Sequence, residues 1–210
     1  MTEPAREESL RKGKRLEYLT LLWNSVEAVV AVGSGVLAGS TALVGFGVDS
    51  LIESSSGAVL LWRLSEKEGG DSREGLALRL VGYSFLALAA WVGWDAAKAL
   101  LRKEAPEESI VGIVLAAVSL IVMPILARAK RKVAGELGSR ALEADSRQTD
   151  ICAYLSAILL VGLGLNAALG WWWADPMAGL AMVPIIGWEG VGALRGEVCS
   201  DCHLDLSSRD

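Results

Sequence analysis

Two acidic residues lie one helical turn apart inside a strongly apolar stretch of the chain, residues 43–61. Asp49 and Glu53 are four positions apart, so on an α-helix their side chains project from the same face. A charged side chain at bilayer depth costs roughly 3 kcal/mol or more, so two acids on one face indicate a bound cation or proton. The alternative is a pair of acids kept neutral by hydrogen bonds to nearby serines, which would leave two costly groups without a use.

A second polar stripe opens another long apolar stretch. At 100° per residue, five polar side chains fall on one side of a helix there: Asp145, Gln148, Thr149, Cys152 and Ser156. Asp150 lies on the opposite side. A carboxylate, an amide oxygen, a thiol and hydroxyls form a mixed hard and soft set, which suits a borderline ion such as zinc better than magnesium or calcium. Cys152 alone would more often fill space in a core, because free cysteine behaves as a small hydrophobic residue. Its position in line with Asp145 and Gln148 gives a ligand role equal weight.

Two further polar residues lie on one face of the first apolar segment, Asn24 and Glu27. Glu27 has three interpretations of equal weight: a third acid of the site, a proton carrier, or a partner of Asn24 near the cytoplasmic end. Asp175 directly precedes Pro176, which is a standard helix start, so we expect it to cap the last helix.

The C-terminal tail contains the motif C-x-x-C-H, formed by Cys199, Cys202 and His203. This spacing can signal attachment of a c-type haem. That haem is attached on the outer side of the membrane, whereas the distribution of basic residues predicts a cytoplasmic tail. Reduced thiols beside the single histidine suit a soft or borderline divalent ion. We favour a labile metal-docking or dimer-bridging tail over a passive chain end.

Membrane helices must position these residues, because 52% of the chain is hydrophobic, only 21% is charged and the mean hydropathy is +0.41. Six apolar stretches approach the roughly 20 residues that span the hydrocarbon core. They are residues 16–37, 41–64, 76–101, 110–126, 144–169 and 176–194. Irregular backbone cannot face lipid, so the predicted fold is an all-α membrane protein with six transmembrane helices. A charged arm, residues 1–15, would precede this domain, residues 16–195, and a short Cys/His tail, residues 196–210, would follow it.

The basic residues predict the orientation. Of the 20 lysines and arginines, 17 lie in the N-terminal arm, around the second and fourth connections, and after the last helix, whereas three lie on the opposite side. Both termini are therefore expected in the cytoplasm, with the protein in the plasma membrane. Residues 130–139 fit a cytoplasmic linker. The net charge of −5 comes largely from acids in loops and tails, so it gives no indication of a nucleic-acid partner.

Three segments resemble parts of the cation diffusion facilitator transporters. They are residues 38–56 (AGSTALVGFGVDSLIESSS), residues 139–160 (SRALEADSRQTDICAYLSAILL) and the run WADP at residues 173–176, which are similar to helices two, five and six of that family. The resemblance covers about residues 16–195 and is closest to the small members that end soon after helix six. It implies six helices with both ends inside the cell.

The resemblance also implies a metal site. Helix two of the family carries a histidine or aspartate and, four residues on, an aspartate, at the positions of Asp49 and Glu53 here. Helix five carries an alanine-aspartate pair, then a histidine three residues later and an aspartate four beyond that. The corresponding residues are Asp145, Gln148 and Cys152, so both helix-five ligands are substituted. The family's cytoplasmic metal-binding domain has no counterpart in these 210 residues.

These observations together predict a homodimeric secondary transporter that exports a divalent transition metal from the cytoplasm in exchange for protons. Zinc is favoured, with cadmium, cobalt, iron and manganese as alternatives, and no tightly bound cofactor is expected. The predicted ligands are Asp49, Glu53, Gln148 and Cys152, with Asp145 as an added ligand or as support for the others. Desolvation favours neutral carboxyl groups, so the same acids would carry protons back once the metal leaves.

Two other classes of function compete with metal export. A non-transporting membrane metal sensor or regulatory subunit would use the same residues, and it would bind metal without moving it across a sealed membrane. A membrane enzyme has no support, because no pair of nucleophile and base is recognisable and the one histidine lies outside the predicted spans.

Overall fold

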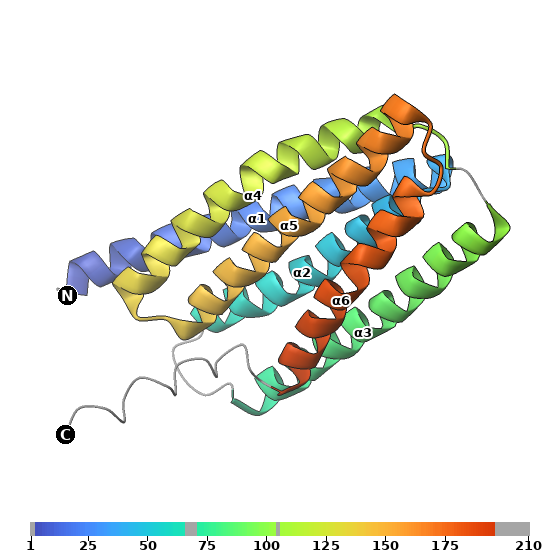
Figure 1. Ribbon diagram of the computed structural model, residues 1–210. Helices are drawn as coiled ribbons and strands as arrows, with labels where there is room; N and C mark the ends of the chain where they lie inside the picture. Colours follow the sequence, from blue (N-terminus) through green and yellow to red (C-terminus); the bar gives the residue numbers. More distant parts are fainter. Residues whose placement is uncertain (1–2, 66–70, 104–105, 196–210) are drawn as a thin grey trace, which may run out of the picture.

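The computed structural model describes residues 3–65, 71–103 and 106–195, and nearly all of them are helical (Figure 1). The six helices are α1 (Glu3–Ala38), α2 (Thr41–Ser65), α3 (Asp71–Arg102), α4 (Ile110–Leu137), α5 (Arg140–Leu169) and α6 (Ala174–Arg195). No strand occurs in the part of the chain that the structure describes. The prediction of an all-α protein with six helices is therefore confirmed.

Five of the helices are long and apolar enough to cross a membrane by length and composition: α1, α3, α4, α5 and α6. The described part of α2, which carries Asp49 and Glu53, is not among these five candidate spans. This helix packs against α1, α3, α5 and α6, and most of its residues from Thr41 to Glu53 are buried. The acids of α2 thus lie in the interior of the bundle, where protein rather than lipid surrounds them.

Both ends of the described chain lie at the same end of the bundle (Figure 1). The start of α1 and the end of α6 are at the same end in Figure 1, as an even number of crossings requires. The α1–α2 turn and the α5–α6 connection are at the other end, and each has a glycine with positive φ, Gly39 at 66° and Gly170 at 64°. Glycine tolerates this left-handed conformation because it has no Cβ atom.

Two helices are longer than the sequence analysis predicted. α1 begins at Glu3, so most of the charged arm is helical, and α4 continues to Leu137, so the prediction of a linker at residues 130–139 was wrong. Both extensions are rich in alanine, leucine, lysine, arginine and glutamate, which have high helix propensity. They also support each other across the bundle, since Ser9 Oγ donates a hydrogen bond to Glu136 Oε2 at 2.8 Å.

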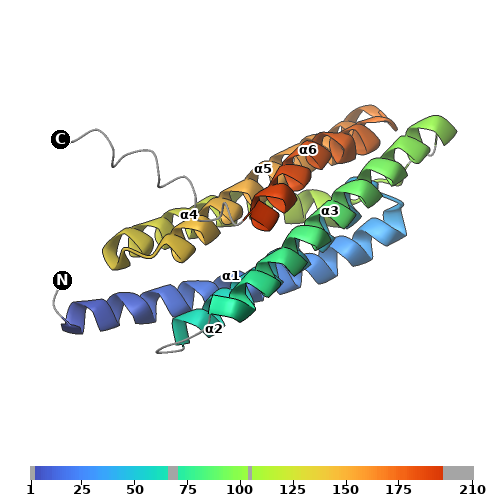
Figure 2. The same cartoon turned by 90° about the horizontal axis from the view of Figure 1, so that it is seen from below.

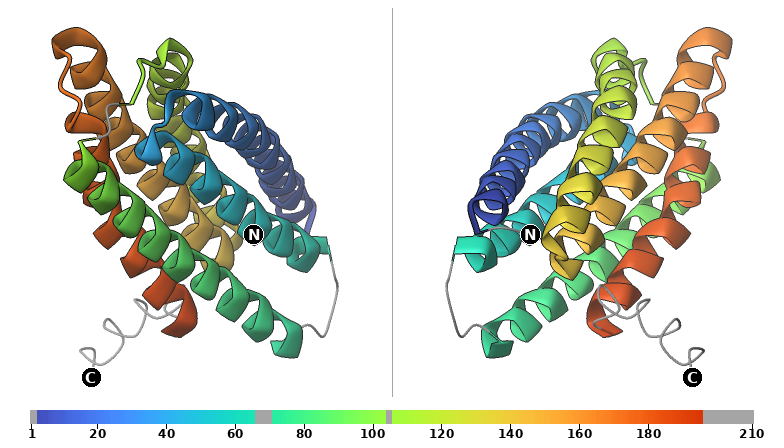
Figure 3. Two further views of the ribbon diagram at one scale, coloured as in Figure 1. Left: turned by 90° about the vertical axis from the view of Figure 1, so that its right-hand side faces the viewer. Right: turned by 90° about the vertical axis from the view of Figure 1, so that its left-hand side faces the viewer.

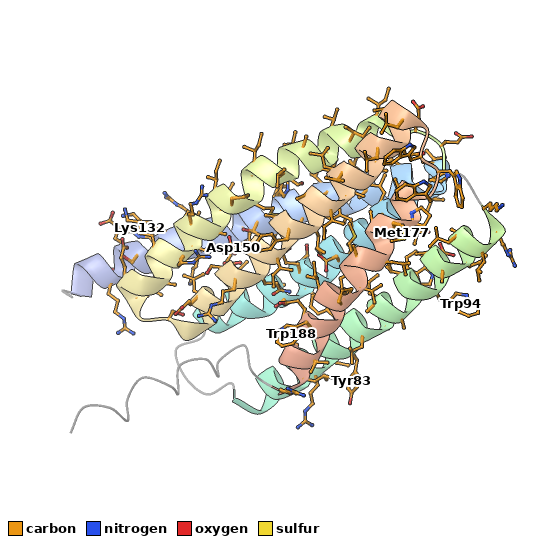
Figure 4. The ribbon with its side chains drawn as sticks, in the orientation of Figure 1. Tyr83, Trp94, Lys132, Asp150, Met177 and Trp188 are labelled. Carbon is orange, nitrogen blue, oxygen red and sulfur yellow. The ribbon has the colours of Figure 1, made fainter. Side chains whose placement is uncertain are left out.

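Helices α3 and α6 form a closely packed pair on one side of the bundle. α3 and α6 run alongside each other in Figures 2 and 3, and they approach at two glycines. A Cβ atom added to Gly82 would lie 2.9 Å from the carbonyl oxygen of Gly190. Large aromatic side chains, including Trp94 and Trp188, project outward from this pair (Figure 4). This pattern is typical of a surface that faces lipid.

Cysteine labelling tests the predicted orientation. In a variant without Cys199 and Cys202, a cysteine placed at the exposed Lys132 (Figure 4) should react with an impermeant thiol reagent only from the cytoplasmic side. A cysteine at the exposed Glu108, at the other end of the bundle, should react only from outside. The native Cys152 is buried and should give no background. The reverse labelling pattern would overturn both the topology and the direction of export.

Candidate functional site

Close packing of α1 against α2 sets the first wall of the site. A Cβ atom on Gly47 would lie 2.8 Å from the backbone nitrogen of Val32, so only glycine allows the two helices to approach this closely. On the same helix, Asp49 is 6% exposed and Glu53 is 3% exposed. The two acids, which the sequence places on one helical face, are therefore enclosed within the bundle.

Glu27 joins four helices at one buried point. Its Oε2 atom accepts a hydrogen bond from Ser50 Oγ of α2 at 2.8 Å, and its Oε1 atom accepts one from Ser119 Oγ of α4. Cys152 Sγ of α5 lies 3.9 Å from Glu27 Oε2. Glu27 is therefore held by hydroxyls from two other helices and lies beside the predicted thiol ligand.

Glu27 is not a partner of Asn24. Both side-chain atoms of the fully buried Asn24 amide lack a hydrogen-bond partner among the described residues. Of the three interpretations of Glu27 from the sequence, this one is wrong. The other two, a site acid or a proton carrier, stay predictions.

One oxygen of Glu53 is hydrogen-bonded to Thr149 of α5. Thr149 Oγ1 donates a hydrogen bond to Glu53 Oε1 at 3.2 Å, whereas Glu53 Oε2 has no partner within the described part of the chain. A buried polar atom without a partner is costly, and native proteins rarely leave one unexplained. Among the described residues, Glu53 Oε2 and the two amide atoms of Asn24 are three such atoms in the same bundle interior.

A buried lysine, which the sequence analysis missed, lies near the end of α4 and beside these residues. Lys130 Nζ is 2.5 Å from Asp145 Oδ2 and 3.3 Å from Glu17 Oε1, and neither Lys130 nor Glu17 has exposed surface. We had counted Lys130 with the cytoplasmic linker. The sequence contains a signal for this burial: Lys130 follows Met123 and Ala127 at helical intervals, so all three lie on the same face of α4.

The three predicted ligands from α5 lie in different surroundings. Asp145 contacts Lys130, Cys152 is buried beside Glu27, and Gln148 is half-buried. Asp150 points away from all three and pairs with Arg131 near the surface, which agrees with its predicted position on the opposite face (Figure 4). Across the described residues, no three histidine, cysteine, aspartate or glutamate side chains converge closely enough to hold a metal ion. The predicted ligands share the bundle interior, but they do not form a preassembled cage.

Two other predicted features have different outcomes. Asp175 lies in the first turn of α6, but its Oδ1 atom accepts a hydrogen bond from Ser40 Oγ at 2.5 Å, and the carboxylate faces the first backbone amides of α2. The prediction that it caps α6 was therefore wrong in its target, because the start of α2 packs against the start of α6 and brings Ser40 to Asp175. The tail motif of Cys199, Cys202 and His203 lies outside the described residues.

Comparison with known proteins gives two findings. The family model of the cation efflux transmembrane domain matches residues 18–198. A protein of Synechocystis sp. that is described as an uncharacterized transporter is 26% identical over 178 residues. The aligned part covers 80% of this chain and 57% of the relative, so the chain spans little more than half the length of that protein.

Proposed function

Because the chain belongs to the cation efflux family, we propose that it exports a divalent transition-metal ion from the cytoplasm in exchange for protons. It is an integral multi-pass membrane protein whose family transports metal cations. Zinc is the metal we favour, and a homodimer in the plasma membrane is the assembly we expect.

The observation that carries the proposal is the group of buried carboxylates. Glu27, Asp49 and Glu53 are all enclosed, and Glu53 keeps one oxygen without a hydrogen-bond partner in the described structure. Ionised acids in such surroundings need a compensating cation. A metal ion that enters between α2 and α5 would supply this charge and use the free oxygen.

The ligands proposed for the ion are Asp49 and Glu53 of α2 with Gln148 and Cys152 of α5. Thr149 already bridges the two helices at Glu53, so a modest shift of one helix would bring these side chains together. A ligand can draw a protein into a conformation that it otherwise rarely occupies, which is the normal basis of alternating access. The thiol of Cys152 beside carboxylate oxygens favours a borderline ion such as zinc over a hard one.

Exchange for protons follows from the same burial. A carboxyl group in an apolar interior is more stable neutral than charged, so protons are the natural replacement once the ion has left. The hydroxyls of Ser50 and Ser119, which donate to Glu27, place a further acid beside Cys152. Glu27 is thus well placed to serve as a proton site next to the metal.

A flux panel in sealed proteoliposomes tests the function. With an imposed pH gradient, we expect zinc to move against the proton flow, with cadmium, cobalt, iron and manganese moving more slowly or not at all. An internal pH dye should report proton movement that depends on the metal. Metal flux that is indifferent to the pH gradient would refute exchange. Zinc binding in detergent without flux in vesicles would instead support the sensor alternative.

A further inference from the structure

We propose that Lys130 is a tethered counter-ion of the transport site: its ammonium group compensates Glu17 and Asp145 and weakens metal binding enough for the ion to be released. This inference rests on the proposed function, because it concerns the same site. It assigns Lys130 a positioning role, and it assigns Asp145 to the lysine rather than to the metal.

The geometry around Lys130 is that of a fully enclosed ion pair. Its Nζ atom lies 2.5 Å from Asp145 Oδ2 and 3.3 Å from Glu17 Oε1, which places one cation between acids of α5 and α1. It is the one basic side chain among the buried residues that the structure describes. Such a pair gives little net stability, because its members lose their hydration, so its retention in a bundle this small favours a further role.

One hydroxyl connects the lysine to the proposed metal ligands. Thr149 Oγ1 lies 3.4 Å from Lys130 Nζ and 3.2 Å from Glu53 Oε1. The ammonium group is therefore within about 7 Å of a proposed metal-binding oxygen, a distance at which two charges in a protein interior interact strongly. A divalent ion bound at Glu53 would be repelled by Lys130 and attracted less strongly by an Asp145 that is already paired.

A transporter must release its ion as well as bind it, and Lys130 would favour release. Asp145 and Glu53 lie on either side of the contact between Lys130 and Thr149, so an uncompensated Asp145 would strengthen the binding of a divalent ion at Glu53 and slow its release. Lys130 compensates Asp145 and raises the potential near Glu53. A purely structural ion pair would also hold α1, α4 and α5 together, but its loss would loosen the site and weaken metal binding. The two roles therefore predict opposite changes in affinity.

Zinc binding in detergent, measured by calorimetry on the full chain, tests the proposal. Lys130→Met should bind zinc at least about tenfold more tightly than the wild type, because a nearby positive charge is removed. In proteoliposomes the same variant should show a lower KM and a lower maximal flux, since release becomes slow. Lys130→Arg should resemble the wild type. The control is Arg131→Met, which removes the neighbouring surface ion pair with Asp150 and should change neither quantity.

A second comparison applies even if Lys130→Met does not fold. Asp145→Asn should bind zinc more weakly than the wild type, and Lys130→Met/Asp145→Asn should bind it about as tightly as the wild type, because the two charges cancel. If Asp145 is instead a direct ligand, the double variant will bind zinc as weakly as Asp145→Asn alone. That result, or unchanged or weaker zinc binding by Lys130→Met, would overturn the counter-ion role.

Failure of this inference is distinguishable from failure of the proposed function. The affinities are measured in detergent and do not depend on flux. A wild-type protein that binds zinc but does not transport it refutes export and leaves the comparison of variants intact. A wild-type protein that binds none of the five metals overturns both proposals.

Discussion

Asp49→Asn and Glu53→Gln should each reduce metal flux in proteoliposomes by at least about a hundredfold while the protein inserts and folds normally. Each change removes a proposed ligand charge, and even residues that merely support metal ligands often contribute ten- to a hundredfold to affinity. The neutral replacements are no costlier to bury than the acids. Gln at position 53 also keeps an oxygen that can accept from Thr149 Oγ1.

The measurement is initial zinc uptake at matched protein density, with membrane insertion and thermal unfolding in detergent checked in parallel. Asp150→Asn is the matched control, because it makes the same chemical change on the outward face of α5, where Asp150 pairs with Arg131. It should retain most of the flux. Wild-type flux in Asp49→Asn and Glu53→Gln, or complete loss in Asp150→Asn, would show that the metal contacts a different face of the bundle.

Gly47→Ala should destabilise the protein by about 1–3 kcal/mol, the usual cost of overfilling a packed interior. The added Cβ atom would lie 2.8 Å from both Val32 Cγ2 and Val32 N, and 2.9 Å from Ala31 Cβ. A backbone nitrogen cannot rotate away, so α1 must move from α2. Such a movement would also separate Ser50 from Glu27, so zinc flux should fall together with stability.

Gly33→Ala is the matched control on α1, since a Cβ atom there has no atom within 4 Å. Both substitutions gain helix propensity, which for alanine over glycine amounts to about 1 kcal/mol. In one detergent, the unfolding temperature of Gly33→Ala should therefore equal or exceed that of the wild type, and the unfolding temperature of Gly47→Ala should be clearly lower. Equal stability of the two variants would mean that the close approach of α1 and α2 is not required.

The number and kind of secondary-structure elements could be predicted from the sequence, because they depend on local properties of the chain. The apolar stretch at residues 41–64 became α2 (Thr41–Ser65), and the stretch at residues 144–169 became most of α5 (Arg140–Leu169). Apolar length and helical spacing also placed Asp49 and Glu53 on an enclosed face.

The tertiary structure decided which partner each buried polar group obtains. Lys130 meets Glu17 from the other end of the chain, and Asp175 meets Ser40, which lies far from it in sequence. Such pairs depend on how whole helices are placed against each other, and neither spacing nor composition carries this information. A tally of basic residues therefore assigned Lys130 to a cytoplasmic linker, whereas packing of α4 between α1 and α5 placed its charge inside the bundle beside Asp145.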